Sequence, residues 1–196
     1  MLGKYQYWLY QEQLDKKTCA KIVKHFDKIK HKSFKGKVGI KSKVNKGVRD
    51  SNVVFSNESS LYSIIGPYID NANIRAGWNV DVDWNETIQF SVYNKKQHYD
   101  WHTDSLEAPY GKESAKMYQG KIRKLSCCVS LTDPKKYEGG EFYFSFGKDK
   151  TPIKIPEFKK QGSLLVFPSF IFHKVTPVTK GTRHSLVNWS LGAPWR

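Results

Sequence analysis

The chain has 196 residues and a net charge of +15, and 39% of its residues are hydrophobic and 14% are aromatic. This composition excludes a disordered or fibrous protein, because a chain with this many apolar residues can bury enough surface to offset the entropy lost on ordering. The length fits one domain better than two.

Compartment is suggested by what the sequence lacks. No apolar run approaches the roughly 18 residues that would span a bilayer, and the first residues carry charge too early for a signal peptide. The cysteines are odd in number, namely Cys19, Cys127 and Cys128. A disulfide framework is therefore not expected, and a reducing, cytoplasmic location is favoured.

Two helices are predicted in the N-terminal part. Residues 14–26 place apolar side chains on one face, with Asp15 at the N-cap position; the face consists of Cys19, Ile22, Val23 and Phe26. Residues 56–73 form a second such run, with Asn57 as a candidate N-cap and Pro67 as a kink or a restart. Its apolar face consists of Leu61, Ile64, Ile65, Tyr68 and Ile69.

Between these helices, residues 28–49 (Lys28–Arg49) hold nine Lys and Arg and no Asp or Glu. Three glycines and the lack of a helical period predict an exposed, mobile loop. Such a patch fits nucleic acid or an acidic protein partner. It fits a solvated loop that aids solubility equally well, and charge alone does not choose between the two interpretations.

From about residue 78 onward the hydrophobic period changes to two, which predicts strands. The strand-like runs are 78–84, 87–93, 124–131, 140–146, 152–156, 162–168, 172–178 and 183–191. Many short strands without intervening helices indicate a closed β-sandwich or barrel. We therefore expect a mainly β fold, a jelly roll with the two helices packed on it. The whole chain, 1–196, would be one domain, with a helical part to about residue 80 and a core over about 81–192.

A first candidate for chemistry is the segment that follows the strand-like run 87–93. His102 and Asp104 are two residues apart, so in an extended segment both side chains point to one face. An imidazole beside a carboxylate is a good start for a divalent metal site. His98 and Asp100 repeat the same spacing, so the residues alone leave both registers open. A surface polar pair near a turn is the ordinary explanation of either one.

His173 ends an apolar run that predicts a buried strand and a turn. An isolated histidine there is usually a satisfied core residue. In a jelly roll, however, a histidine late in the chain can converge on a His-Xaa-Asp pair from an early strand. Two histidines and one carboxylate form the facial triad of non-haem iron(II) oxygenases.

Arg183 lies ten residues beyond His173. If the chain makes a hairpin at residues 179–182, Arg183 starts the strand next to the one that carries His173. A buried arginine is costly unless it meets an anion, and a dicarboxylate would supply one. Alternation allows only one of Arg183 and His184 to point inward, so a surface arginine is the competing interpretation.

Two further features are assigned structural roles. Gly139 and Gly140 precede a strand and predict a tight turn with positive φ, which leaves Glu138 and Glu141 facing solvent. Cys127 and Cys128 cannot both face one side of a strand, so a dithiol site is not expected. The phosphate-loop, dinucleotide-binding and nucleophile-elbow motifs are missing from the sequence.

The motifs taken together resemble a known family. Residues 93–104, with Tyr, Gln, Tyr, His and Asp at positions 93, 97, 99, 102 and 104, are similar to the first metal motif of prolyl 4-hydroxylase-type Fe(II)/2-oxoglutarate dioxygenases. Most of residues 85–192 resembles the PKHD-type hydroxylases of bacteria and their phages. If the protein is encoded by a phage, the expected cytoplasmic location is the cytoplasm of the host. One departure is Lys96, where the family usually has Gly.

The resemblance implies a site. His102, Asp104 and His173 would be the iron ligands and so the catalytic centre, which decides the register against His98 and Asp100. Arg183 would bind the distal carboxylate of 2-oxoglutarate and Tyr93 would hydrogen-bond to the same molecule. Tyr99 and Trp189 match positions on the substrate side. The implied cofactor and cosubstrates are Fe(II), 2-oxoglutarate and O2, with ascorbate as an accessory reductant.

The expected activity is hydroxylation with release of succinate and CO2, because halogenating relatives have a small residue in place of Asp104. We expect a peptidyl residue as substrate, with proline favoured. Nucleic acid as substrate is the alternative that the basic segment suggests, although the second arginine of repair demethylases of this fold is missing after Arg183. A non-catalytic jelly-roll module that binds nucleic acid is a third hypothesis. Substrate loops are expected over 105–123 and in the basic segment, and the oligomeric state is not predicted.

Overall fold

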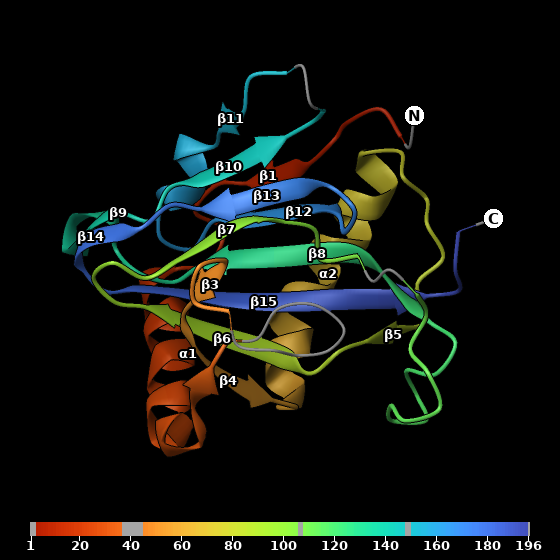
Figure 1. Cartoon of the computed structure of the whole chain (residues 1–196), viewed down its shortest axis with the longest axis horizontal. Coiled ribbons are helices and arrows are strands. Elements are labelled where there is room, and N and C mark those ends of the chain that lie inside the picture. Colours follow the sequence, from red (N-terminus) through yellow and green to blue (C-terminus); the bar gives the residue numbers. More distant parts are fainter. Residues whose placement is uncertain (1–2, 37–44, 106–107, 148–149, 196) are drawn as a thin grey trace.

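The computed structural model describes residues 3–36, 45–105, 108–147 and 150–195 (Figure 1). Two α-helices, α1 (Lys16–Ile29) and α2 (Ser59–Arg75), precede most of the strands. The first strands are β1 (Trp8–Tyr10), β2 (Phe34–Lys35), β3 (Arg49–Asp50), β4 (Asn52–Ser56), β5 (Trp84–Asn85), β6 (Ile88–Tyr93), β7 (His98–His102) and β8 (Ile122–Ser130). The later strands are β9 (Tyr137–Gly139), β10 (Phe142–Ser145), β11 (Ile153–Lys154), β12 (Leu164–Pro168), β13 (Phe172–Val175), β14 (Val178–Gly181) and β15 (Arg183–Gly192).

The strands form two larger antiparallel sheets and one two-stranded pair. The major sheet has the order β1-β12-β8-β15-β6-β4-β2, with β5 added beside β15. The minor sheet has the order β11-β10-β13-β7-β3, and β14 pairs with β9. Figure 1 shows the long strands β8 and β15 crossing the centre of the molecule, with α1 and α2 against the major sheet. The prediction of a mainly β fold with two helices is confirmed.

One hydrophobic core lies between the helices and the major sheet. The buried face of α1 (Cys19, Ile22 and Phe26) meets that of α2 and the inner residues of β6, β8 and β15. Phe26 stacks on Phe90 of β6 with ring centroids 4.4 Å apart. Asp15 caps α1, because its carboxylate accepts a bond from the Thr18 backbone N–H at 2.7 Å, as predicted.

A second, smaller core lies between the two sheets. Phe142, Phe144 and Val175 of the minor sheet pack there against Leu165 and Phe167 of the major sheet. Neighbouring residues of one strand supply the two cores, since Cys127 faces the helices and Cys128 faces the minor sheet. This confirms that the two thiols point to opposite sides of β8. All three cysteines are free thiols and buried.

Some predicted elements differ from the structure. Residues 78–83 are not a strand, because the Asn73 side chain bonds both backbone groups of Val80 and holds this segment at the end of α2. The N-cap of α2 is Glu58 and not Asn57, and Pro67 lies within a continuous helix. The alternation in residues 78–82 therefore reflected contacts other than sheet pairing, and only the end of the predicted run, at Trp84, enters a strand.

The basic segment 28–49 is not a single loop. Its first part completes α1, passes through a 3-10 turn (Lys30–Lys32) and forms β2, while its last part forms β3. Residues 37–44 of this prediction lie outside the described residues. Arg49 is buried, so it adds no charge to the surface. The prediction of a loop is wrong for both ends, because short strand pairings with β4 and β7 fix them, whereas the predicted exposure holds for Lys28 and for residues 30–34 and 45–47.

The predicted hairpin at residues 179–182 is also wrong. Residues 179–181 belong to β14, which pairs with β9, and β15 then enters the major sheet between β6 and β8. His173 and Arg183 therefore lie on different sheets. No helix in the described part of the chain is long and apolar enough to cross a membrane.

Candidate metal centre and active site

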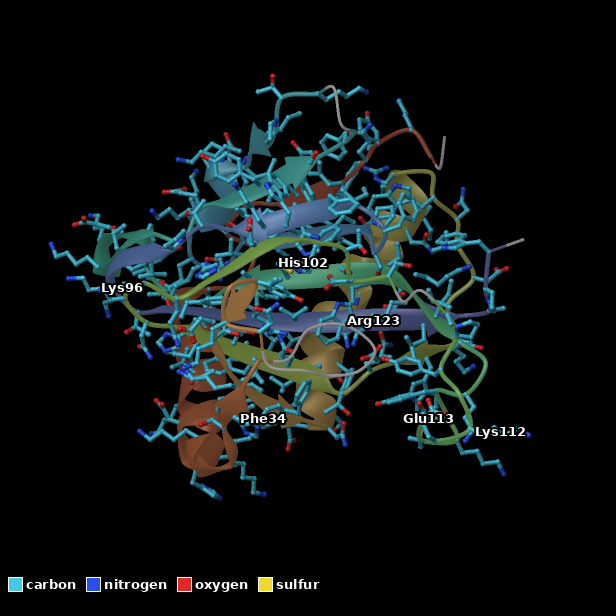
Figure 2. All side chains as sticks on the ribbon, in the orientation of Figure 1. Phe34, Lys96, His102, Lys112, Glu113 and Arg123 are labelled. Carbon is cyan, nitrogen blue, oxygen red and sulfur yellow. The ribbon has the colours of Figure 1, made fainter. Side chains whose placement is uncertain are left out.

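Three residues that could bind a metal converge between the sheets. His102, Asp104 and His173 each offer one ligand atom, and these atoms lie within 4.8 Å of one another. His102 ends β7 and is the cross-strand partner of His173 on β13. The ladder shifts register between this pair and the Tyr99–Val175 pair, so Tyr99 and His102 lie on one face although they are three positions apart in the sequence. Their rings stack with centroids 3.4 Å apart. Figure 2 shows His102 at the centre of the molecule.

Backbone bonds orient both imidazoles. Nδ1 of His102 lies 2.7 Å from the Asp100 carbonyl oxygen, and Nδ1 of His173 lies 2.9 Å from that of Ile171. A carbonyl only accepts, so each Nδ1 carries the proton and each Nε2 presents a lone pair. Nε2 of His102 lies 3.8 Å and Nε2 of His173 lies 3.6 Å from the carboxylate of Asp104.

A set of short contacts holds Asp104 in the bend after β7. Ser126 Oγ of β8 donates to Oδ2 at 2.8 Å, and Ser126 in turn lies 2.9 Å from Ser169 Oγ. The backbone N–H of Asp104 donates to the Ser169 carbonyl at 2.9 Å. The carboxylate is therefore fixed from β8 and from the turn between β12 and β13.

The protonation states suit metal ligands. Burial raises the pKa of the Asp104 carboxyl, but the neighbouring His173 and His102 and the Arg123 guanidinium outweigh it and lower the pKa to about 2. Burial and the adjacent His173 hold the pKa of His102 well below its ordinary value of 6.5. An ionised carboxylate and a neutral imidazole are the forms that bind a cation.

The opposite wall of the same cavity carries a buried arginine. Arg183 is 3% exposed, lines this cavity and donates to Ser185 Oγ at 3.2 Å. Among the described residues it has no carboxylate partner. Tyr93, its cross-strand neighbour on β6, lines the cavity beside it. Gly140, with a φ of +60°, leaves the space for this arginine, because a Cβ there would lie 2.9 Å from Arg183 Cδ.

The alternation at Arg183 and His184 is resolved by the structure. His184 points to the helix side, where it stacks on Phe90 and its Nδ1 lies 3.0 Å from Thr132 Oγ1. The arginine therefore points inward, as the sequence required of one of the two. Arg183 points into the cavity, so an anion site at this residue remains a prediction that fits the structure. The predicted hairpin on which it was based does not exist.

Tyr99 and Trp189, the predicted substrate-side residues, both line the cavity. Trp189 is 5% exposed, and its indole N–H makes no hydrogen bond among the described residues. This N–H lies near enough to Asp104 to help lower the pKa of that carboxyl without good hydrogen-bond geometry. This buried indole N–H can donate a hydrogen bond to a ligand that enters the cavity beside the metal ligands.

Three residues of the site were not predicted from the sequence. Arg49 of β3 lines the cavity, with its guanidinium carbon 4.5 Å from the centroid of Tyr99. Arg123 at the start of β8 lies over Trp189, with the corresponding distance 3.8 Å, and pairs with Glu86. The alternation of β8 could have indicated Arg123, but nothing local to residues 49 or 86 indicates their long-range partners.

Other candidates lie outside the centre. His98 and Asp100 are on the exposed side of β7, so the alternative register is excluded by position. Glu138 pairs with Lys180, and Glu141 pairs with Lys154 and Lys159. Their assignment to surface roles is confirmed for Glu138, while Glu141 is half-buried in its ion pairs.

The turn before the metal motif explains the departure at Lys96. Gln97 N donates to the Asn94 carbonyl at 2.9 Å, which closes a β-turn with Lys96 as its third residue. Lys96 has a φ of +72°, a backbone conformation that favours glycine. Lys96 adopts the positive φ that this turn requires, and because it carries a Cβ this conformation is strained. Figure 2 shows Lys96 at the edge of the molecule, far from His102.

The fold and the site together define a class of protein. It is a mainly β protein with a buried His-Asp-His centre that faces an arginine. Residues 88–191 match the family model of the 2OG-Fe(II) oxygenase superfamily. This match covers more than half of the chain, which therefore belongs to that superfamily. The family implies Fe(II), 2-oxoglutarate and O2 as cofactor and cosubstrates, as expected from the resemblance.

Curated relatives carry the name PKHD-type hydroxylase. One from Xylella fastidiosa is 31% identical over 105 residues, which are 52% of this chain and 42% of that protein. One from Synechococcus is 34% identical over 99 residues, which are 50% of this chain and 39% of that protein. The chain thus spans about two-fifths of the length of these relatives.

Solved structures share the fold over nearly the whole chain. A prolyl-4-hydroxylase of Pseudomonas putida has a TM-score of 0.68 at 17% identity and covers 95% of this chain and 92% of its own. A prolyl hydroxylase of Trichoplax adhaerens, in complex with a fragment of a hypoxia-inducible factor, has a TM-score of 0.72 at 14% identity, with 94% and 83% covered. At these identities the likeness concerns the fold.

Proposed function

We propose that the chain is an Fe(II)- and 2-oxoglutarate-dependent hydroxylase that acts on a peptidyl residue, with proline favoured. The observation that carries the proposal is the convergence of His102, Asp104 and His173 in a cavity whose other wall holds Arg183, which meets no carboxylate in the described part of the chain. Two imidazoles and a carboxylate with open space beside them are a donor set for iron(II). The names of the relatives and of the structural neighbours support the reaction class and the favoured residue.

The residues take the following roles. His102, Asp104 and His173 hold the iron, and Arg183 pairs with the distal carboxylate of 2-oxoglutarate. The Tyr93 hydroxyl donates a hydrogen bond to that cosubstrate. Burial raises the pKa of this phenol, so the hydroxyl keeps its proton. Tyr99 and Trp189 form the substrate side. When bound, iron, 2-oxoglutarate and O2 supply an oxidative decarboxylation that yields succinate, CO2 and the hydroxylated residue.

Part of the wall around the centre is apolar. Phe142, Val175 and Val187 line the cavity together with the ligands. A low-dielectric wall strengthens the pairing of Arg183 with a carboxylate and prevents side reactions of the activated site. Ascorbate would serve to return an oxidised metal to iron(II).

We further propose that the facing sheets form a double-stranded β-helix and that the chain is one domain. In this domain a helical part to about residue 80 supports a core over about 81–192. The buried, free thiols support a reducing, cytoplasmic location. A peptide partner is supported by the peptide bound to the Trichoplax adhaerens neighbour.

A nucleic-acid substrate ranks below the peptide. Its support is the net charge of +15, whereas Arg49 of the basic segment is buried and the names of the relatives and structural neighbours are those of hydroxylases. A non-catalytic binding module ranks lower still, since a scaffold has no use for two facing imidazoles and a buried cation.

The test is an anaerobic titration with Fe(II) and 2-oxoglutarate that follows the visible charge-transfer band expected at about 500 nm. His173→Ala should abolish the band and the later release of succinate in air. His98→Ala is the matched control, because it removes an imidazole that lies outside the centre and should keep both. Equal loss in the two variants, or a band that survives His173→Ala, would overturn the metal assignment. Peptides that contain proline, offered to the loaded protein, then test the substrate class by a mass gain of one oxygen.

A further inference from the structure

A buried carboxylate outside the metal ligands organises the substrate side. Glu86 is 6% exposed and precedes β6. Arg123 binds it with two parallel bonds, Nε to Oε1 at 2.6 Å and Nη2 to Oε2 at 2.7 Å. The Tyr110 hydroxyl donates a third bond to Oε1 at 2.7 Å. We call these three residues the Glu86 brace.

The brace contacts Trp189 in two ways. The guanidinium carbon of Arg123 lies over the indole, 3.8 Å from the ring centroid. The backbone N–H of Glu86 also donates to the Trp189 carbonyl at 2.9 Å. The position of the Trp189 ring in the cavity is therefore coupled to the position of one carboxylate.

Tyr110 comes from the connection between β7 and β8, where substrate loops were expected. Its backbone is fixed to the start of β8, since Tyr110 N donates to the Lys121 carbonyl at 2.9 Å and Gly120 N donates to the Tyr110 carbonyl at 2.8 Å. Figure 2 shows Arg123 near the centre, with Lys112 and Glu113 of the same connection far out at the surface. The phenol thus reaches inward from an otherwise exposed connection.

We propose that Tyr110 and Glu86 are positioning residues for the substrate-side wall, which they hold in place through Arg123 and Trp189. The role of that wall rests on the proposed function. The physical reason is that a forked arginine needs both carboxylate oxygens in one plane, and Tyr110 fixes the rotation of that plane by its bond to Oε1. Without Tyr110 the carboxylate can rotate, and the guanidinium and the indole above it lose their common orientation.

Tyr118 supplies a matched control on the same connection. Its hydroxyl lies 3.2 Å from both the backbone N and Oγ1 of Thr87, next to Glu86 in sequence, and its ring lies 5.5 Å from that of Tyr110. Tyr118→Phe removes one phenol oxygen from the same loop without touching the Glu86 carboxylate. The difference between Tyr110→Phe and Tyr118→Phe is therefore the brace itself.

The first readout is independent of activity. In an ¹H–¹⁵N spectrum of the whole chain, the Trp189 indole resonance is the one of six that Trp189→Phe removes. Tyr110→Phe and Glu86→Gln should both shift or broaden this resonance, and Tyr118→Phe should leave it in place. A Trp189 signal that Tyr110→Phe leaves unmoved overturns the proposal, as does an equal shift from Tyr118→Phe. Tyr110→Phe changes one oxygen, so it decides the question even where Glu86→Gln fails to fold.

The second readout is kinetic, with poly-L-proline as the probe substrate. Tyr110→Phe should raise the KM for this peptide by about three- to tenfold and leave the KM for 2-oxoglutarate unchanged. A parallel rise in both would indicate general loosening and contradict a positioning role. If the wild-type chain does not turn over the probe while the indole shift is seen, the proposed peptide substrate fails and the brace stands.

Discussion

The two faces of the major sheet differ in what they bury, although the same strands supply both. Toward the helices, Leu186 and Val129 pack in a large and mainly apolar core. Toward the minor sheet, the cavity is lined by polar groups that are just as inaccessible, including Gln89, Arg183 and Ser185. Alternation along each strand lets the two faces vary independently.

The helix face of the major sheet stabilises the fold, whereas the cavity face contains groups whose burial is unfavourable. Close packing against α1 and α2 contributes the hydrophobic term, whereas a buried arginine without a carboxylate costs free energy until a ligand supplies the anion. Substitutions on the helix face should therefore cost stability, and substitutions on the cavity face should cost ligand binding.

The largest effect is expected on the helix face. Phe90→Ala removes the ring that stacks on Phe26 and His184, and it should lower the free energy of unfolding by about 3–5 kcal/mol. Denaturant titration measures this loss. The matched control is Gln89→Leu on the other face of β6, for which about 1.5 kcal/mol or less is expected. Equal losses would mean that the cavity side also supports the fold.

Arg183→Met should have the opposite profile. Removal of the cation should weaken 2-oxoglutarate binding by about 2–5 kcal/mol, on the order of 30-fold or more, because the distal carboxylate loses its partner. The melting temperature of the ligand-free chain should not fall, since the variant buries no uncompensated charge. Isothermal titration in the presence of Fe(II) and a thermal melt without it separate the two terms. A large fall in melting temperature with unchanged affinity would assign Arg183 to the fold.

The sequence predicted those parts of the molecule that depend on local patterns. Period-two runs identified most strands, and the opposite facing of Cys127 and Cys128 follows from alternation alone. The residues that converge at the centre were identified by family resemblance, since spacing could not choose between His102 and His98. Sheet membership could not be predicted from local patterns, because nothing in residues 179–182 reveals that β15 joins the major sheet.

The residues that were missed share a physical cause. Glu86 and Arg123 are 37 positions apart and pair only after β6 and β8 enter one sheet. Arg49 belonged to a segment whose charge suggested an exposed loop, yet strand pairing with β7 buries it. Burial of a charged residue is set by long-range contacts, and composition predicts the reverse.

A smaller effect is expected at the turn before the metal motif. Lys96→Gly should raise the free energy of unfolding by about 1 kcal/mol, because glycine adopts a φ of +72° without the cost that a Cβ adds. Lys95→Gly in the same turn is the control and should be neutral or destabilising, since Lys95 has no positive φ. Chemical denaturation of the pair decides between relief of strain and a general gain from glycine.

The smallest effect concerns the pH dependence of the helix face. Burial lowers the pKa of His184 below its ordinary value of 6.5, so the unfolded chain binds a proton here before the folded chain does. The resulting stability is complete above about pH 6.5 and is lost as the pH falls toward the folded pKa. Melting curves between pH 7 and pH 5 should show this decline, to which His102 also contributes because its pKa is lowered in the same direction. His184→Phe should therefore make the decline shallower while keeping a ring on Phe90. Asp50 and Glu141 have pKa values lowered by their hydrogen-bonding partners against the effect of burial, and they contribute at more acidic pH. A decline that is equally steep in His184→Phe would mean that His184 does not contribute to it.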